Sequence, residues 1–293
     1  MNSMNSMNIK KKLVSMIADK IDSTGLLPWD KGFLSSTTTP VNRVSKKEYR
    51  GINSLLLRVY GAETNEFVTY KQAQALGGKV KSGEHGLPVV WYTRWNATKQ
   101  KPYKKEEYED GDKVVPFLKY STVFELSQCE GIERFRVNEP ERETQCKSTV
   151  ENWLQEFTDN TGLKISHTLD TACYRPAFHQ ICIRNIREFK SDDFYYSTLF
   201  HECTHSTGVA LGRYEPAKFG SVQYSKEEVV AELGSLFMRV HFGIDGQVAE
   251  DNSVAYISGW SEQLRKNPDW LISGANAAQK AFDYMLEMGG ETE

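Results

Sequence analysis

The sequence predicts an α+β fold divided into two domains, and three observations support this prediction. At 293 residues, the chain is longer than most single domains. Residues 87–126 contain two segments rich in β-branched and aromatic residues, separated by a charged stretch, which predicts a β-ribbon. From residue 150 onward helical patterns dominate, with short strand-like segments near the start. We therefore place a small N-terminal domain at 1–127, a linker at 128–149 and a C-terminal domain at 150–293.

The N-terminal part begins with helices and ends with the ribbon. Ile9, Leu13 and Ile17 lie at helical spacing, and Gly25 can end the helix that they predict. Thr69 is a suitable N-cap for a later helix, which the glycines at 77–78 can end. The expected elements are helices at 9–27, 54–60 and 70–76, a turn at 79–86, and strands at 87–95 and 116–126.

The C-terminal part follows a stretch, residues 130–148, that is mostly charged and polar and therefore typical of a linker. Short apolar segments then predict strands, and longer periodic segments predict helices. The expected elements are helices at 150–161, 254–264 and 275–288, and strands at 165–169 and 180–183.

Residues 199–208 contain the motif His201-Glu202-Cys203-Thr204-His205. On a helix, positions i and i+4 share one face, so His201 and His205 can bind one metal ion. Glu202 can then take a proton from a water in the open coordination position, which is the chemistry of a zinc metallopeptidase. Ser191 and the two aspartates after it are candidate N-caps for this helix, and Gly208 can end it.

A second predicted helix, residues 224–234, supplies two carboxylates at i and i+4, Glu228 and Glu232, among apolar residues. Ser225 is its candidate N-cap. Buried carboxylates are costly unless a metal or a donor meets them. The spacing resembles the second metal-binding helix of gluzincins, which implies Glu228 as the third ligand and Glu232 as the residue that orients a ligand histidine. Gluzincins usually have Asp where this chain has Glu232, so both assignments stay open.

The charge is distributed unevenly along the chain. Residues 1–127 hold 20 Lys and Arg against 13 Asp and Glu, a net charge of +7, whereas residues 128–293 hold 16 against 26, a net charge of −10. A basic half predicts a polyanionic partner for the N-terminal domain.

Aromatic residues and cations alternate in that basic half, as a single-stranded DNA surface requires, because cations track phosphates while aromatic faces stack on unpaired bases. In the alternative interpretation, Trp91 and Trp95 face a core and the lysines only confer solubility. The lysines at 99, 101, 104 and 105 extend the basic pattern. The candidate DNA-binding residues are Tyr70, Lys71, Lys79, Lys81, Trp91, Tyr92, Arg94 and Trp95.

The five cysteines form no C-x-x-C pair, which favours a reduced, cytoplasmic protein. No apolar segment reaches the length that a membrane span needs, and the first residues lack the apolar region of a signal peptide. We therefore expect no membrane partner.

Over nearly its whole length the chain resembles the ArdC-type antirestriction proteins of conjugative plasmids. The resemblance rests on segments 27–29, 49–53, 69–73, 76–86 and 123–126, and, in the C-terminal half, on 200–208, Arg213, Tyr224 and 227–232. It implies an N-terminal single-stranded DNA-binding domain, a zincin-like metallopeptidase domain, and a role in shielding incoming plasmid DNA from host restriction.

Two functional hypotheses follow. In the first, the chain is a zinc-dependent peptidase acting on a host protein, with Glu202 as general base and Tyr224 or Arg213 steadying the oxyanion. In the second, it is a non-catalytic protein that coats single-stranded DNA and has a structural or vestigial metal site. Glu202 favours the first, because a structural zinc site does not need that carboxylate. Mn²⁺ or Co²⁺ could replace Zn²⁺ in such a site.

Overall fold

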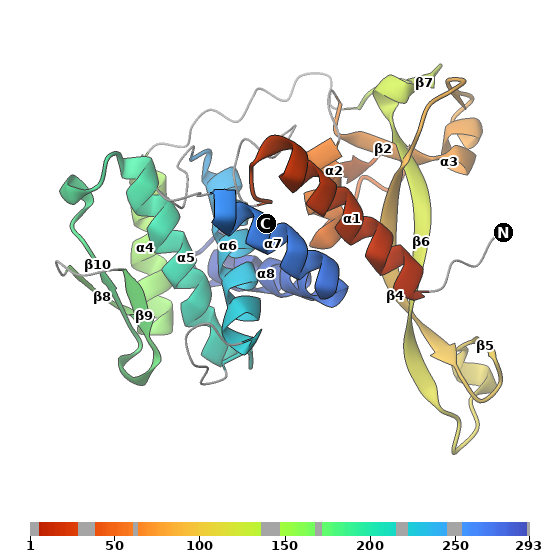
Figure 1. Ribbon diagram of the computed structural model, residues 1–293. Helices are drawn as coiled ribbons and strands as arrows, with labels where there is room; N and C mark the ends of the chain where they lie inside the picture. The colour runs from red at the N-terminus through yellow and green to blue at the C-terminus, as the bar shows by residue number, and fades with distance from the viewer. Residues whose placement is uncertain are drawn as a thin grey trace.

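The computed structural model describes residues 6–28, 39–60, 64–135, 147–167, 172–214, 222–244 and 254–291. It shows the predicted α+β architecture, with a sheet on either side of a group of helices (Figure 1). Most of the expected linker, residues 136–146, lies outside the described residues, as does the segment 29–38. No helix in the described ranges has both the length and the apolar character needed to cross a membrane.

The N-terminal part contains a five-stranded sheet of order β1-β2-β6-β4-β5. Its two longest strands form the predicted ribbon, with Leu87 opposite Val123 and Asn96 opposite Val114. Residues 79–80 form a short strand instead of part of the expected turn, because they pair with residues 129–130. The elements are α1 (Ser6–Thr24), β1 (Val41–Asn42), α2 (Ile52–Tyr60), β2 (Glu66–Thr69), α3 (Tyr70–Ala75), β3 (Lys79–Val80), β4 (Leu87–Asn96), β5 (Lys101–Pro102), β6 (Val114–Glu125) and β7 (Cys129–Glu130).

Local signals account for the ends of the N-terminal helices. Gly25 ends α1 in a left-handed conformation (φ 66°), and its N–H donates to the carbonyl of Ile21 at 2.8 Å. Thr69 caps α3 as predicted: its hydroxyl accepts from the backbone N–H of Gln72, whose side chain accepts from the N–H of Thr69.

The C-terminal part contains a three-stranded sheet of order β8-β10-β9, followed by four helices. Strand β9, only three residues long, has no counterpart among the elements predicted from the sequence. The helix that carries Glu228 and Glu232 begins at Val222, so Ser225 lies inside it. Our prediction of Ser225 as its N-cap is therefore wrong. The elements are α4 (Lys147–Thr161), β8 (Lys164–His167), β9 (Cys173–Arg175), β10 (Gln180–Ile183), α5 (Asp192–Ala210), α6 (Val222–Phe242), α7 (Val254–Lys266) and α8 (Pro268–Met288).

One apolar core joins the two halves of the chain. Leu13 and Ile17 of α1 are fully buried in the same cluster as Leu233 of α6 and Leu271 of α8, and Figure 1 shows α1 beside α7 and α8. Burial of each such side chain contributes about 1.5–3 kcal/mol. The C-terminal helices therefore hold α1 in place, although α1 lies at the start of the basic half.

Helices α5 and α6 approach each other closely. A Cβ atom on Gly234 would lie 2.5 Å from Cγ2 of Thr204, so any other residue there would force the two helices or Thr204 to shift. At the next position of α6, the hydroxyl of Ser235 donates to the carbonyl of Ser197 at 2.8 Å. These contacts position the carboxylates of α6 over the histidines of α5.

Candidate functional site

Helix α5 presents the His-Glu-x-x-His motif as the sequence predicts. Ser191 caps it by accepting from the N–H of Phe194 at 3.4 Å. Phe200 and Cys203 are fully buried in a second apolar cluster, so the opposite face of the helix turns toward α6. The helix continues past Gly208 to Ala210, which corrects our prediction that this glycine ends it. Gly212, with φ 65°, follows the last turn instead.

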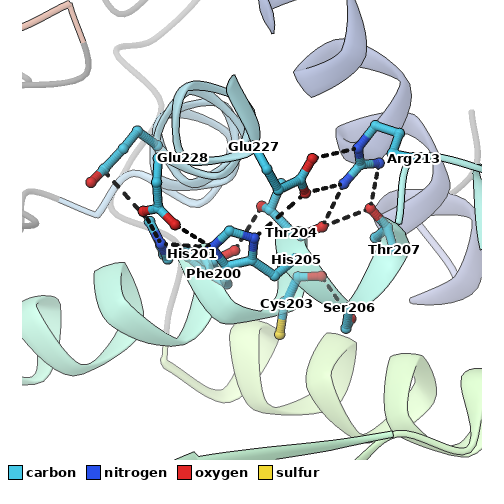
Figure 2. Close-up of polar contacts among 11 residues, drawn as sticks. Phe200, His201, Cys203, Thr204, His205, Ser206, Thr207, Arg213, Glu227 and Glu228 are labelled. Carbon is cyan, nitrogen blue, oxygen red and sulfur yellow. Dashed lines mark hydrogen bonds and ion pairs between the residues drawn. The ribbon is translucent and has the colours of Figure 1, made fainter. Parts of the chain in front are cut away.

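Three donor groups converge between α5 and α6 (Figure 2). The Nε2 atoms of His201 and His205 lie 3.1 Å apart. The carboxylate of Glu228 places Oε2 at 3.5 Å from Nε2 of His201 and Oε1 at 3.5 Å from Nε2 of His205. The three ligand atoms lie within 4.8 Å of one another. Two imidazoles and one carboxylate, aimed at a common point, are a donor set that fits a single divalent ion.

Two further carboxylates of α6 face the other ring nitrogens. Oε2 of Glu232 lies 3.7 Å from Nδ1 of His201, and Oε1 of Glu227 lies 3.5 Å from Nδ1 of His205. Metal-binding histidines are typically oriented by a carboxylate at the second nitrogen. This placement favours Glu228 over Glu232 as the third ligand. Glu232 then has the orienting role that the resemblance implied.

Glu227 is a site residue with no role predicted from the sequence, although its position next to Glu228 was a usable signal. Arg213 holds this carboxylate: its Nη2 lies 3.0 Å from Oε1 and its Nε 3.4 Å from Oε2 of Glu227. The same guanidinium donates to the carbonyl of Thr204 and the hydroxyl of Thr207, each at 3.0 Å. Arg213 is therefore committed to Glu227 and α5, and its expected contact with an oxyanion is not supported. The side chain of Tyr224, the other candidate for that role, lies outside the described residues.

The charges of this cluster are mutually dependent. Burial acts to lower the pKa of His201, but Glu232, Glu228 and Glu202 raise it well above its ordinary value. Burial acts to raise the pKa of Glu228, but His201 and His205 hold it well below its ordinary value. The two imidazoles are thus surrounded by ionised carboxylates. A divalent cation that binds there would replace the protons of the histidines.

Glu202 differs from the other carboxylates of the site. Its side chain is buried, with 7% of the residue exposed. Within the described part of the chain, its carboxylate acts on His201 and Cys203 through its charge but forms no hydrogen bond or ion pair. It is therefore available to act on a water molecule. Cys203 faces the core on the other side of α5, and burial raises the pKa of its thiol, so it is neither a ligand nor a reactive thiol.

The ribbon presents aromatic residues on both faces. Trp91 is 44% exposed and Tyr92, on the opposite face, is 51% exposed. Trp95 is half-buried and packs against Phe117, with ring centroids 5.4 Å apart. The alternative interpretation, in which both tryptophans face a core, is therefore wrong for Trp91.

The other candidate DNA-binding residues do not gather at the same place. Tyr70 and Lys71, in the first turn of α3, are exposed, and Lys79 pairs with Glu130 at 3.0 Å. Lys81 donates to the carbonyl of Ser127 at 2.7 Å. Figure 1 places α3 and β7 at one end of the β4–β6 ribbon and β5 at the other. The candidates therefore form two separate groups along the N-terminal part, while Arg94 belongs to the ribbon group.

Family models divide the chain in two. Residues 7–124 match the N-terminal domain of anti-restriction factor ArdC, and residues 152–278 match a zincin-like metallopeptidase domain.

Curated relatives align along nearly the whole chain. It is 30% identical to two proteins named DNA primase TraC of Escherichia coli, over 96% and 95% of its length. These alignments cover only 20% and 27% of the two primases, so the chain spans about a quarter or less of their length. It is also 30% identical to an uncharacterized protein, y4eC, of Sinorhizobium fredii, over 95% of this chain and 91% of that protein.

Two solved structures share the fold over nearly the whole chain. The metal-free crystal structure of the antirestriction protein ArdC from plasmid R388 is 28% identical and superposes with a TM-score of 0.74, covering 98% of this chain and 99% of that one. The Mn(II)-bound structure is 27% identical, with a TM-score of 0.75 and coverage of 97% and 99%. Because both domain models match this chain and the fold is shared over nearly its whole length, the chain belongs to the ArdC-type antirestriction proteins.

Proposed function

We propose that this protein protects incoming conjugative plasmid DNA from host restriction by binding single-stranded DNA through its N-terminal part, and that its C-terminal domain is a divalent-metal peptidase. The observation that carries the enzymatic part is the convergence of His201, His205 and Glu228 beside an uncommitted Glu202. The similarity to ArdC of plasmid R388, one form of which is described as Mn(II)-bound, supports both the antirestriction role and a divalent ion.

In this proposal His201, His205 and Glu228 hold the ion, with Zn²⁺ the best match to the donor set and Mn²⁺ or Co²⁺ as alternatives. When bound, such an ion supplies Lewis acidity toward a peptide carbonyl and a water of lowered pKa. Glu202 is placed to act as the general base: it would take a proton from the water whose oxygen bonds to the carbonyl carbon, and would give that proton to the amine released when the C–N bond breaks. Glu232 and Glu227 keep the two imidazole rings in orientation throughout.

The charge distribution supports a protein substrate over a nucleic acid at this centre. The half that carries the motif has a net charge of −10 and repels a phosphate backbone. A nuclease would also gather carboxylates around paired metals, whereas this donor set suits one ion. We therefore expect the purified protein to leave single-stranded and duplex DNA uncut with zinc, manganese or magnesium present. Metal-dependent cleavage that Glu202→Gln abolishes would overturn this assignment.

The exposed ribbon supports DNA binding by the other half. Trp91 and Lys119 are directly opposite each other on one face, and Tyr92 and Arg94 share the other. We expect affinity for single strands to exceed affinity for duplex, because stacking needs unpaired bases, and to fall steeply as salt rises. Equal affinity for the two forms would leave only a generic basic surface.

Glu202→Gln separates the enzymatic hypothesis from that of a non-catalytic coat with a structural or vestigial metal site. We expect this variant to keep its metal and its affinity for DNA. In a conjugation assay into a restricting host, lost protection means that the metal centre acts chemically, and retained protection means that coating the DNA suffices. Glu262→Gln, an exposed change on α7, is the matched control.

A further inference from the structure

A cavity of about 610 Å³ lies between the outer part of the ribbon and the segment 96–113 that joins its strands. One face of the ribbon forms its floor. Tyr92 and Arg94 lie on this face because side chains alternate along β4, and Pro116, directly opposite Arg94 on β6, lies there too. Tyr103 and Tyr108 of the connecting segment form the other wall.

The tyrosines that line this cavity leave aromatic surface uncovered. Tyr92 is 51% exposed and Tyr108 is 46% exposed. Tyr103 and Tyr108 contact each other edge to face, with centroids 6.1 Å apart, so this pair covers at most one ring face. The guanidinium of Arg94 lies 5.7 Å from the centroid of Tyr103. Three phenol rings and one guanidinium therefore surround a space large enough for a planar aromatic ligand.

Three lysines of the same segment, Lys99, Lys101 and Lys104, are already paired with carboxylates, unlike Arg94. Lys99 pairs with Glu109 at 2.7 Å and with Asp112 at 3.2 Å. Lys101 and Lys104 both pair with Glu107. Among the described residues, Arg94 contacts the ring of Tyr103 and no carboxylate. The cleft thus combines stacking surface with a cation that has no anionic partner in the described part of the chain.

We propose that this cleft holds an unpaired base of single-stranded DNA, stacked on Tyr92 and Tyr108, with an adjoining phosphate at Arg94. The proposal rests on the proposed DNA-binding function and specifies its site. It assigns base recognition to the face of the ribbon opposite Trp91 and Trp95, and it adds Tyr103 and Tyr108, which come from a segment with a mixed and mostly neutralised charge. A base inside a duplex is stacked on its neighbours and cannot enter, so the cleft selects single strands.

The test compares two probes with the full-length chain: a fluorescein-labelled oligothymidylate of about 16 nucleotides and an abasic deoxyribose-phosphate strand of equal length. Tyr92→Leu and Tyr108→Leu keep apolar volume at exposed positions but remove the stacking ring. We expect each to weaken oligothymidylate binding by about 5- to 150-fold and to leave binding of the abasic strand unchanged. Arg94→Gln should weaken both probes and reduce the salt slope by about one.

Phe178→Leu is the matched control, because Phe178 is 68% exposed and lies in the C-terminal half. Unchanged oligothymidylate binding by both tyrosine variants, or equal losses on both probes, would overturn the proposal. Loss of oligothymidylate affinity in Trp91→Leu but in neither tyrosine variant would show that bases stack on the Trp91 face of the ribbon, which would also overturn the proposal. Thymidine monophosphate that binds the parent as tightly as the strand would also overturn it, because the site would then be one for free nucleotides. A parent chain that binds neither probe would instead refute the proposed DNA-binding function itself.

Discussion

Oε1 of Glu227 lies 3.5 Å from Nδ1 of His205, on the side of the imidazole opposite the nitrogen that faces His201. Nη2 of Arg213 donates a hydrogen bond to the same oxygen of Glu227 at 3.0 Å. Arg213 therefore fixes Glu227, and Glu227 orients His205. On the other histidine, Glu232 faces Nδ1 of His201. Each candidate ligand imidazole has its own carboxylate, and both carboxylates come from α6.

If Glu227 orients His205, Glu227→Ala should weaken divalent-metal affinity by about 10- to 100-fold, because orienting carboxylates typically contribute this much. Glu227→Gln keeps an acceptor oxygen and should recover part of the loss. Competition against a fluorescent zinc chelator measures both. Glu262→Ala, on the exposed surface of α7, should bind like the parent. Complete loss of metal in Glu227→Ala would instead identify Glu227 as a ligand.

His201, His205 and Glu228 should each be required for metal binding, whereas Glu232 should not be required. We expect His201→Ala, His205→Ala and Glu228→Ala to lose bound metal and the rise in melting temperature that saturating Zn²⁺ gives the parent, because an ion that binds only the folded state stabilises it. Glu232→Ala should retain metal at lower affinity. Metal content after gel filtration and thermal unfolding with and without Zn²⁺ provide the readouts. If Glu228→Ala keeps full occupancy and Glu232→Ala has none, the two roles are exchanged.

Gly234→Ala should destabilise the protein by about 1–3 kcal/mol, because the new methyl group overpacks the contact between α5 and α6. Its Cβ would lie 2.5 Å from Cγ2 and 2.6 Å from Oγ1 of Thr204. Urea unfolding measures the change, and the double variant with Thr204→Ala should recover part of it. Gly259→Ala is the matched control: nothing lies within 4 Å of that added Cβ, so the change should be neutral or stabilising by up to about 1 kcal/mol. Equal effects of the two alanine substitutions would show that α5 and α6 can separate without cost.

Glu107 should titrate far below an ordinary glutamate. Hydrogen bonds from Lys101 and Lys104 lower its pKa from 4.5 to about 2. Because the folded-state pKa is depressed, the contribution of Glu107 to stability is complete above pH 4.5 and declines as the pH falls toward about 2. Side-chain carboxyl chemical shifts followed by NMR measure this pKa directly. Replacing both lysines with glutamine should return it toward 4.5, and an unchanged value in that variant would exclude the two ammonium groups as the cause.

Much of this protein could be predicted from the sequence because the deciding geometry is local. A helix repeats every 3.6 residues, so His201 and His205 had to share a face once Ser191 started the helix. Strand alternation likewise placed Trp91 and Tyr92 on opposite faces of the ribbon. The cap at Thr69 is a contact between residues three positions apart and needs no tertiary context.

Tertiary structure decided what depends on packing between distant segments. Glu227, Glu228 and Glu232 are all carboxylates of α6. The position of α6 against α5 determines which histidine nitrogen each carboxylate faces. The contact of Gly234 with Thr204 helps to set that position. Segment 96–113 is rich in lysine, but its fold places carboxylates beside Lys99, Lys101 and Lys104. The apolar stripe of α1 showed that the helix is buried on one side. Only the assembled core shows that its partners are α7 and α8, more than 200 residues away, because an apolar surface specifies burial without specifying what covers it.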